Sequence, residues 1–85
     1  PNPFREKVEI KFCIGQGAED RELKIYDVSG RVVKDFGLVT SSLNLSAVVI
    51  WDGRDDKERL LPSGVYYCRL IQGGETQTKK VLLVR

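Results

Sequence analysis

Apolar and polar residues alternate with a period of two along the first part of the chain. Between residues 7 and 14 the apolar positions are Val8, Ile10, Phe12 and Ile14, separated by charged residues and Cys13. Successive side chains of a strand point to opposite faces, so this pattern predicts a strand with one buried face. By the same alternation, Cys13 is expected to point away from the core.

Further strands are predicted between clusters of turn-forming residues. A second strand around Leu23 and Ile25 stops at Asp27-Val28-Ser29-Gly30, where Asp27 starts a turn by binding its own backbone and Gly30 supplies a left-handed residue. The return arm and the later strands are expected at residues 31–36, 43–51, 65–71 and 76–84. No segment has ten residues of clean helical period. Six or seven short strands predict an all-β, antiparallel sandwich.

Two segments leave a choice about which side chains face solvent. Residues 48–51, Val-Val-Ile-Trp, are apolar on both alternations. They are therefore either buried on both faces or display Val48 and Ile50 as an apolar stripe to a partner. In a later strand, Tyr66 is expected in the core, and the opposite parity of Tyr67 predicts an exposed ring.

Size and composition describe one globular domain over residues 1–85. Of the 85 residues 41% are hydrophobic and 31% charged, and the net charge is +2. No apolar run approaches the roughly 20 residues of a membrane span, and the charge is too small to predict nucleic-acid binding. Histidine is absent, which excludes Ser-His-Asp and Cys-His mechanisms. The start Pro1-Asn2-Pro3, without methionine, is typical of a module cut from a longer protein.

The stretch Trp51-Asp52-Gly53-Arg54-Asp55-Asp56 has two interpretations. A calcium site needs several oxygen ligands brought to one point, and Asp52, Asp55 and Asp56 are the candidates. The simpler interpretation is a strand end, with Trp51 as a core anchor and Asp52-Gly53 as a turn-forming pair. The turn is the preferred prediction, because neighbouring arginines offset the acids. No metal or other cofactor is expected.

The two cysteines, Cys13 and Cys68, are expected to remain free thiols. By the alternation along their strands, the side chains of Cys13 and Cys68 should point to opposite faces. A disulfide needs Cα atoms within about 7 Å and suitable side-chain directions. Two cysteines without histidine cannot make a zinc site. Cys68 follows Tyr66-Tyr67, a sequence similar to the Tyr-x-Cys of an immunoglobulin strand in which the tyrosine closes a corner.

Five short motifs, taken in order and spacing, resemble one bacterial family. They are Pro1-Asn2-Pro3-Phe4, Tyr26-Asp27-Val28-Ser29-Gly30-Arg31, Trp51-Asp52-Gly53-Arg54-Asp55-Asp56, Pro62-Ser63-Gly64-Val65-Tyr66-Tyr67 and Lys80-Val81-Leu82-Leu83-Val84-Arg85. The chain is similar to the C-terminal sorting domains of type IX (Por) secretion, and equally to the immunoglobulin-like domain of flagellar hook-capping proteins. The sequence departs from the family's pattern at two positions. Cys68 stands where an aromatic residue is expected, and Ala47 stands where glycine is frequent. The resemblance implies a seven-stranded immunoglobulin-like (fibronectin III-like) sandwich.

The resemblance also implies a non-catalytic C-terminal module that directs its parent protein through the periplasm to the medium or the outer cell surface. Its partners would be the secretion machinery or cell-surface components, and the rest of the parent chain. The residues implied as the sorting signal are Gly64, Val65, Tyr66, Lys79, Lys80, Val81, Leu82, Leu83, Val84 and Arg85. Removing residues 79–85 is expected to abolish export even where the remainder stays folded.

Two other functions stay open at this point. A structural interaction module, as in a flagellar hook cap or an adhesin stalk, would use Val48 and Ile50 as a contact stripe. An accessory carbohydrate-binding domain of a secreted hydrolase would use Tyr67, because aromatic rings stack on sugar rings.

Overall fold

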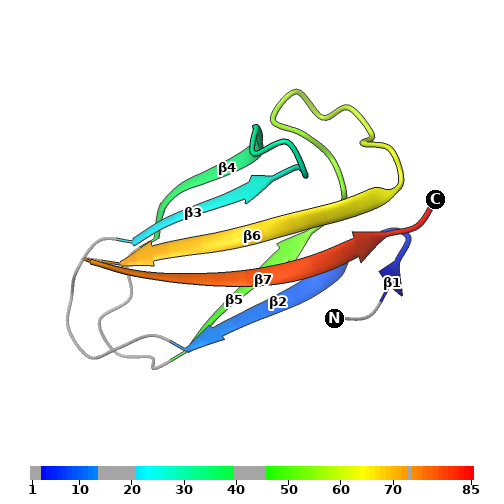
Figure 1. Cartoon of the computed structure of the whole chain (residues 1–85). Coiled ribbons are helices and arrows are strands. Elements are labelled where there is room, and N and C mark those ends of the chain that lie inside the picture. The colour runs from blue at the N-terminus through cyan, green and yellow to red at the C-terminus, as the bar shows by residue number, and fades with distance from the viewer. Residues whose placement is uncertain (1–2, 14–20, 40–45, 73) are drawn as a thin grey trace.

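The computed structural model describes residues 3–13, 21–39, 46–72 and 74–85, which form an all-β sandwich (Figure 1). Its strands are β1 (Pro3–Phe4), β2 (Val8–Cys13), β3 (Arg21–Tyr26), β4 (Val32–Val39), β5 (Ser46–Trp51), β6 (Gly64–Gln72) and β7 (Glu75–Leu83). Five of them make one sheet in the order β1-β7-β6-β3-β4, and β2 and β5 make the other. The predicted fold class is confirmed. A helix that could span a membrane is not found among the described residues.

The strands follow the predicted pattern closely, with one difference at the sheet edge. The expected hairpin is formed by β3 and β4, which pair antiparallel with register shifts after Leu23 and Ile25. The pairing of β1 with β7 is parallel, so the five-stranded sheet is mixed rather than antiparallel throughout. The expected strand positions Ile14 and Leu43 and the side chain of Cys13 lie outside the described part of the chain.

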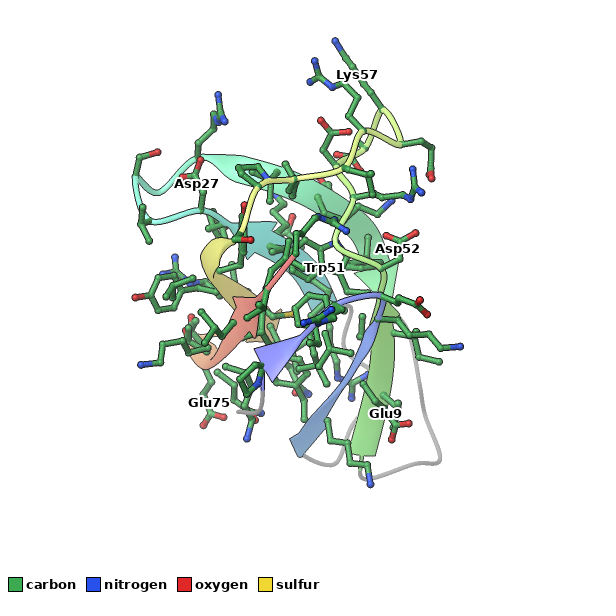
Figure 2. All side chains as sticks on the ribbon, turned by 90° about the vertical axis from the view of Figure 1, so that its right-hand side faces the viewer. Glu9, Asp27, Trp51, Asp52, Lys57 and Glu75 are labelled. Carbon is green, nitrogen blue, oxygen red and sulfur yellow. The ribbon has the colours of Figure 1, made fainter. Side chains whose placement is uncertain are left out.

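The core lies between the inner faces of the two sheets. Trp51, at the end of β5, is 1% exposed and stands at the centre of this layer. Its ring lies 5.6 Å from that of Phe4 on β1 and 5.3 Å from that of Tyr66 on β6. Figure 2 shows Trp51 surrounded by other side chains. One aromatic cluster therefore joins the short edge strand, the second sheet and the central strand, and it confirms Trp51 as a core anchor.

Strand β5 resolves the choice that its sequence left open. Val49 and Trp51 are buried, whereas Val48 and Ile50 are 52% and 62% exposed. The two-stranded sheet thus has one buried face, and its outer face carries the predicted apolar stripe. Tyr66 is in the core as expected, but Tyr67 is half-buried rather than exposed, because its ring lies on the outer face of a central strand with neighbours on both sides.

Cys68 is a free thiol at the centre of β6. It is fully buried, and burial raises the pKa of the Cys68 thiol to about 12 because the charged thiolate is disfavoured in an apolar surrounding. At this pKa the thiol stays protonated at neutral pH and behaves as a small apolar core residue.

Candidate functional site

The two parts of the predicted sorting signal are neighbours in the five-stranded sheet. In the antiparallel pairing of β6 with β7, Gly64 lies opposite Leu83, Val65 opposite Leu82 and Tyr66 opposite Val81. The β6–β7 pairing thus joins two motifs that are separated by about a dozen residues of sequence. Apart from Val84 and Arg85, which follow β7, the residues proposed for recognition therefore lie in one continuous piece of sheet.

Alternation divides the last strand into a buried face and an exposed face. Val81 and Leu83 on the inner face are buried in the core, whereas Lys80 and Leu82 on the outer face are exposed. Lys79 shares the inner-face parity but is exposed as well. Burying one such aliphatic side chain contributes about 1.5–3 kcal/mol to folding. Removing residues 79–85 would remove two core side chains together with the main-chain pairing of β7. Loss of export after removal of this tail would therefore not separate lost recognition from lost folding, and the role of residues 79–85 in export stays a prediction.

Beyond β7, the side chain of Arg85 binds three main-chain carbonyl groups from different parts of the chain. Its Nε donates to the carbonyl of Leu61 at 2.7 Å, and one terminal nitrogen donates to the carbonyl of Gly53 at 2.8 Å. The other terminal nitrogen lies 3.5 Å from the carbonyl of Arg5. The main-chain N–H of Arg85 donates to the Ser63 hydroxyl at 2.9 Å. We call these four hydrogen bonds the Arg85 clasp.

Gly53 is required by the same arrangement. Its φ angle is +75°, a region that side chains with a Cβ rarely adopt. A Cβ at this position would lie 2.8 Å from a guanidinium nitrogen of Arg85 and 3.3 Å from a methyl carbon of Leu83. The missing side chain of Gly53 therefore leaves the room in which Arg85 packs.

The first residues of the acidic stretch form the predicted turn. The indole N–H of Trp51 donates to the carbonyl of Arg54 at 3.0 Å, and the Asp52 carboxylate accepts from the main-chain N–H of Arg54 at 3.1 Å. Trp51 and Asp52 thus fix both sides of the turn that places Gly53 beneath Arg85. The strand-end interpretation of this sequence is confirmed.

Asp55 organises the rest of the loop. Its carboxylate accepts from the main-chain N–H groups of Lys57 and Arg59, each at 2.9 Å, and pairs with the Arg59 Nε at 2.8 Å. The hydrogen bond from the Arg59 main chain, assisted by the Arg59 side chain and the Lys57 N–H, lowers the pKa of Asp55 against the opposing effect of desolvation. The pKa is lowered because these donors stabilise the ionised carboxylate.

The calcium candidates do not converge. Asp52 and Asp55 bind the main-chain groups described above, and Asp56 instead reaches β4, where both of its oxygens lie 3.2 Å from the N–H of Asp35. Lys34 stands 3.9 Å from the Asp56 carboxylate. Among the described residues no group of three acidic, cysteine or histidine side chains could hold a metal ion.

Tyr66 ties the start of β6 to the loop before it. Its hydroxyl donates to the carbonyl of Pro62 at 2.7 Å, four residues upstream. This is the tyrosine corner that the Tyr-x-Cys sequence indicates. Burial raises the pKa of Tyr66, so the hydroxyl remains a donor at neutral pH. Because Ser63 in the same loop binds Arg85, the corner and the clasp hold one loop from two sides.

The turn between β3 and β4 is built around Asp27, as predicted. The Asp27 carboxylate accepts from the N–H and hydroxyl of Ser29 and from the N–H of Arg31, at 3.0, 2.6 and 3.0 Å. These hydrogen bonds lower the pKa of Asp27, and the bond from the Ser29 hydroxyl has the largest effect. Gly30 follows with a φ of +89°. Figure 2 shows this turn at the edge of the molecule, where its role is structural.

The aromatic and apolar surface candidates lie apart from the clasp. Tyr67 and Tyr26 occupy facing positions on β6 and β3, and the guanidinium of Arg69 lies 4.8 Å from the centre of the Tyr26 ring. An arginine stacked on the ring already covers part of this aromatic face. Contact between copies through Val48 and Ile50, and sugar binding at Tyr67, both stay predictions.

Sequence reasoning misses most of the clasp. It singles out Arg85, but it does not connect this residue with its partners Arg5, Gly53, Leu61 and Ser63. Three of the four contacts are to main-chain carbonyls and the fourth is to a serine hydroxyl, groups that any sequence supplies in quantity. The one available signal is the glycine after Trp51-Asp52, since a required glycine often marks close approach of another segment.

Comparison with known proteins identifies one matching family and several structures with a similar fold. Residues 1–51 match the family described as "Secretion system C-terminal sorting domain". No curated protein matches the chain. Dimeric latent PorU from Porphyromonas gingivalis has a similar fold, with a TM-score of 0.74 and 23% identity over 99% of this chain and 9% of that chain.

Two further solved structures share the fold. PorZ, described as an essential bacterial surface component of the type IX secretion system of Porphyromonas gingivalis, gives a TM-score of 0.65 at 24% identity, over 100% of this chain and 11% of that chain. FlgD from P. aeruginosa gives 0.64 at 20% identity, over 88% of this chain and 59% of that chain. At these identities the likeness shows the fold. The chain spans about a tenth of PorU and PorZ.

Replacing Gly53 tests the clasp. Gly53→Ala should lower the free energy of unfolding by about 2–4 kcal/mol, since the backbone is strained and the new methyl displaces Arg85 and Leu83. Gly30→Ala is the matched control, because Gly30 also has a positive φ but no atom lies within 4 Å of the point where a Cβ would stand. Urea unfolding of both variants, each repeated with Arg85→Ala, measures the difference. Gly53→Ala should lower the free energy of unfolding more than Gly30→Ala does, and this difference should become smaller in the Arg85→Ala background. Equal losses of stability for the two glycine variants would contradict the clasp.

The lowered pKa of Asp55 predicts a loss of stability in acid. A carboxyl whose folded pKa lies below its unfolded value, about 3.9, contributes fully above that value and loses its contribution as the pH falls through the folded pKa. Asp55→Asn should therefore be destabilising at pH 7, and its difference from the wild type should narrow toward roughly pH 2. Urea unfolding across this range measures it. Asp52→Asn is the control, because the Asp52 carboxylate accepts from one main-chain N–H, and it should cost less at pH 7. A pH-independent effect of Asp55→Asn would contradict the assignment.

Proposed function

Because this chain belongs to the family of secretion system C-terminal sorting domains, we propose that it directs its parent protein through type IX secretion without chemistry of its own. Family membership implies a parent that is secreted or held at the surface of a bacterium. The route through the periplasm, recognition by the secretion machinery and attachment to the cell surface are parts of the proposal.

The observation that carries the proposal is the shared sheet of β6 and β7. Val65 and Leu82 lie opposite each other on its outer face, while Val81 and Leu83 anchor the same strand in the core. A receptor can bind this outer face in one conformation. The inner face of β7 is packed in the core, and the Arg85 clasp holds the end of the strand. A non-catalytic role is supported by the lack of histidine in the sequence and by the complete burial of Cys68.

Export of a reporter tests the sorting role. Residues 1–85 are fused to the end of a periplasm-directed fluorescent protein in a bacterium that has type IX secretion. Fluorescence should appear outside the cell and should stay in the periplasm in a translocon mutant. Retention of a folded fusion in the wild-type host would contradict the proposal.

Point variants separate recognition from folding, which removal of the tail cannot do. Leu82→Ser changes an exposed side chain of β7, and Val32→Ser changes a similarly exposed apolar side chain on β4, at the opposite edge of the same sheet. Export should fall with Leu82→Ser and stay unchanged with Val32→Ser, while thermal melting shows both variants folded. Equal export of the two variants would show that the outer face of β7 is not the part that is read.

A further inference from the structure

A groove separates the two sheets along one side of the sandwich. It runs between β2 and β7, which lie next to each other without pairing (Figure 1). The residues that line it are Val8, Glu9, Ile10, Lys11, Thr78, Lys79, Lys80 and Val81, and its volume is about 580 Å³. Ile10 and Val81 are buried core residues at its floor, so the groove joins an apolar floor to polar strand edges.

The β7 side of this groove carries main-chain groups that no described strand uses. The N–H of Val84 donates to the carbonyl of Phe4 at 2.8 Å, which shows that Val84 turns its main chain toward the β1 edge. The β6–β7 register has no shift, so Lys80 and Thr78, at the same parity, turn their N–H and carbonyl groups toward that edge. In the described part of the chain β1 pairs only with Leu82 and Leu83. The edge is therefore open beside the groove.

The side chains around the open edge are mainly cationic. Lys11, Lys79 and Lys80 line the groove with one acid, Glu9. Lys11 and Glu9 are 3.8 Å apart and both well exposed, a pairing of little energetic weight. Within the described residues no ion pair includes Lys79 or Lys80. Lys79 lies opposite the buried Cys68, so it belongs to the inner face and sits at the mouth of the groove.

We propose that this groove binds an extended segment of a partner protein in which apolar and acidic residues alternate. The segment adds to β7 as a strand: its main chain pairs with Thr78 and Lys80, its apolar side chains face inward and cover the floor, and its carboxylates face outward on the side of Lys80. The identity of this partner rests on the proposed function, because a sorting domain is expected to bind a component of the secretion machinery.

The open edge also has a protective interpretation, which the experiment must distinguish. Lysines on an edge strand, above all one that points inward, discourage pairing with other chains. If Lys79 and Lys80 only protect the edge, acidic and basic peptides should bind equally poorly, and replacing a lysine with threonine should increase strand pairing.

A peptide titration decides between these alternatives. The probe is a fluorescein-labelled peptide of about eight residues, close to a typical strand length, with valine and glutamate in alternation. Fluorescence anisotropy with the purified chain should show saturable binding that weakens with added salt. The same peptide with lysine in place of glutamate should bind at least about tenfold more weakly. Equal binding of the two peptides, or none of either, would overturn the proposal.

Variants of the chain locate the binding. Lys80→Glu should weaken binding of the acidic peptide about tenfold, and Thr78→Pro should weaken it similarly by removing the free N–H without changing charge. Lys57→Glu is the matched control, because it makes the same change of charge in a loop that Figure 2 shows far from Glu9. Circular dichroism confirms folding of each variant. An equal loss with Lys57→Glu, or unchanged binding with Thr78→Pro, would contradict strand addition in the groove.

The binding experiment is independent of export. If the fusion is exported but the purified chain binds no acidic peptide, the groove proposal fails and the sorting function stands. If the chain binds the peptide but the fusion is retained, the sorting function fails, and with it the identity of the partner.

Discussion

The guanidinium of Arg85 occupies the space that a side chain at position 53 would need. This single constraint connects the segment after β7 with the turn after Trp51 and, through Leu61 and Ser63, with the loop that leads into β6. An arginine suits the position, because its planar fork presents several donors in fixed directions to carbonyls from separate segments. The acidic stretch, a candidate metal site by sequence, instead contains Gly53, whose main-chain carbonyl accepts a hydrogen bond from Arg85.

The constraint explains how one strand can serve both folding and recognition. The inner side chains of β7 belong to the core, and the outer ones are available to a partner. Both functions require that the strand keep one register, since a slip by a single residue would exchange its two faces. Pairing with β6 fixes the register along the strand, and the Arg85 clasp fixes it beyond the last pair, after Leu83. Loss of the clasp is therefore expected to loosen the presented surface before it unfolds the core.

Much of the fold and the family can be predicted from the sequence, because period-two alternation and turn residues act locally. The turn at Asp27 and the corner closed by Tyr66 depend on partners within a few residues, and the sequence predicts both. It does not predict the parallel pairing of β1, because a two-residue strand carries no periodic pattern. The clasp joins Arg85 to carbonyl groups as far away as Arg5, and no local pattern encodes such a contact. Membership of the sorting-domain family, inferred from five motifs in register, is confirmed by the match over residues 1–51.

Amide hydrogen exchange shows whether the Arg85 side chain orders the segment after β7. The N–H of Val84, bonded to Phe4 in the wild type, should exchange slowly there and about tenfold or more faster in Arg85→Ala, because the segment after β7 then opens locally. The N–H of Val81, within the β6–β7 pairing, should change little in the same experiment. Fast exchange of Val84 in the wild type, or equal protection with and without the Arg85 side chain, would contradict the claim that Arg85 orders the segment after β7.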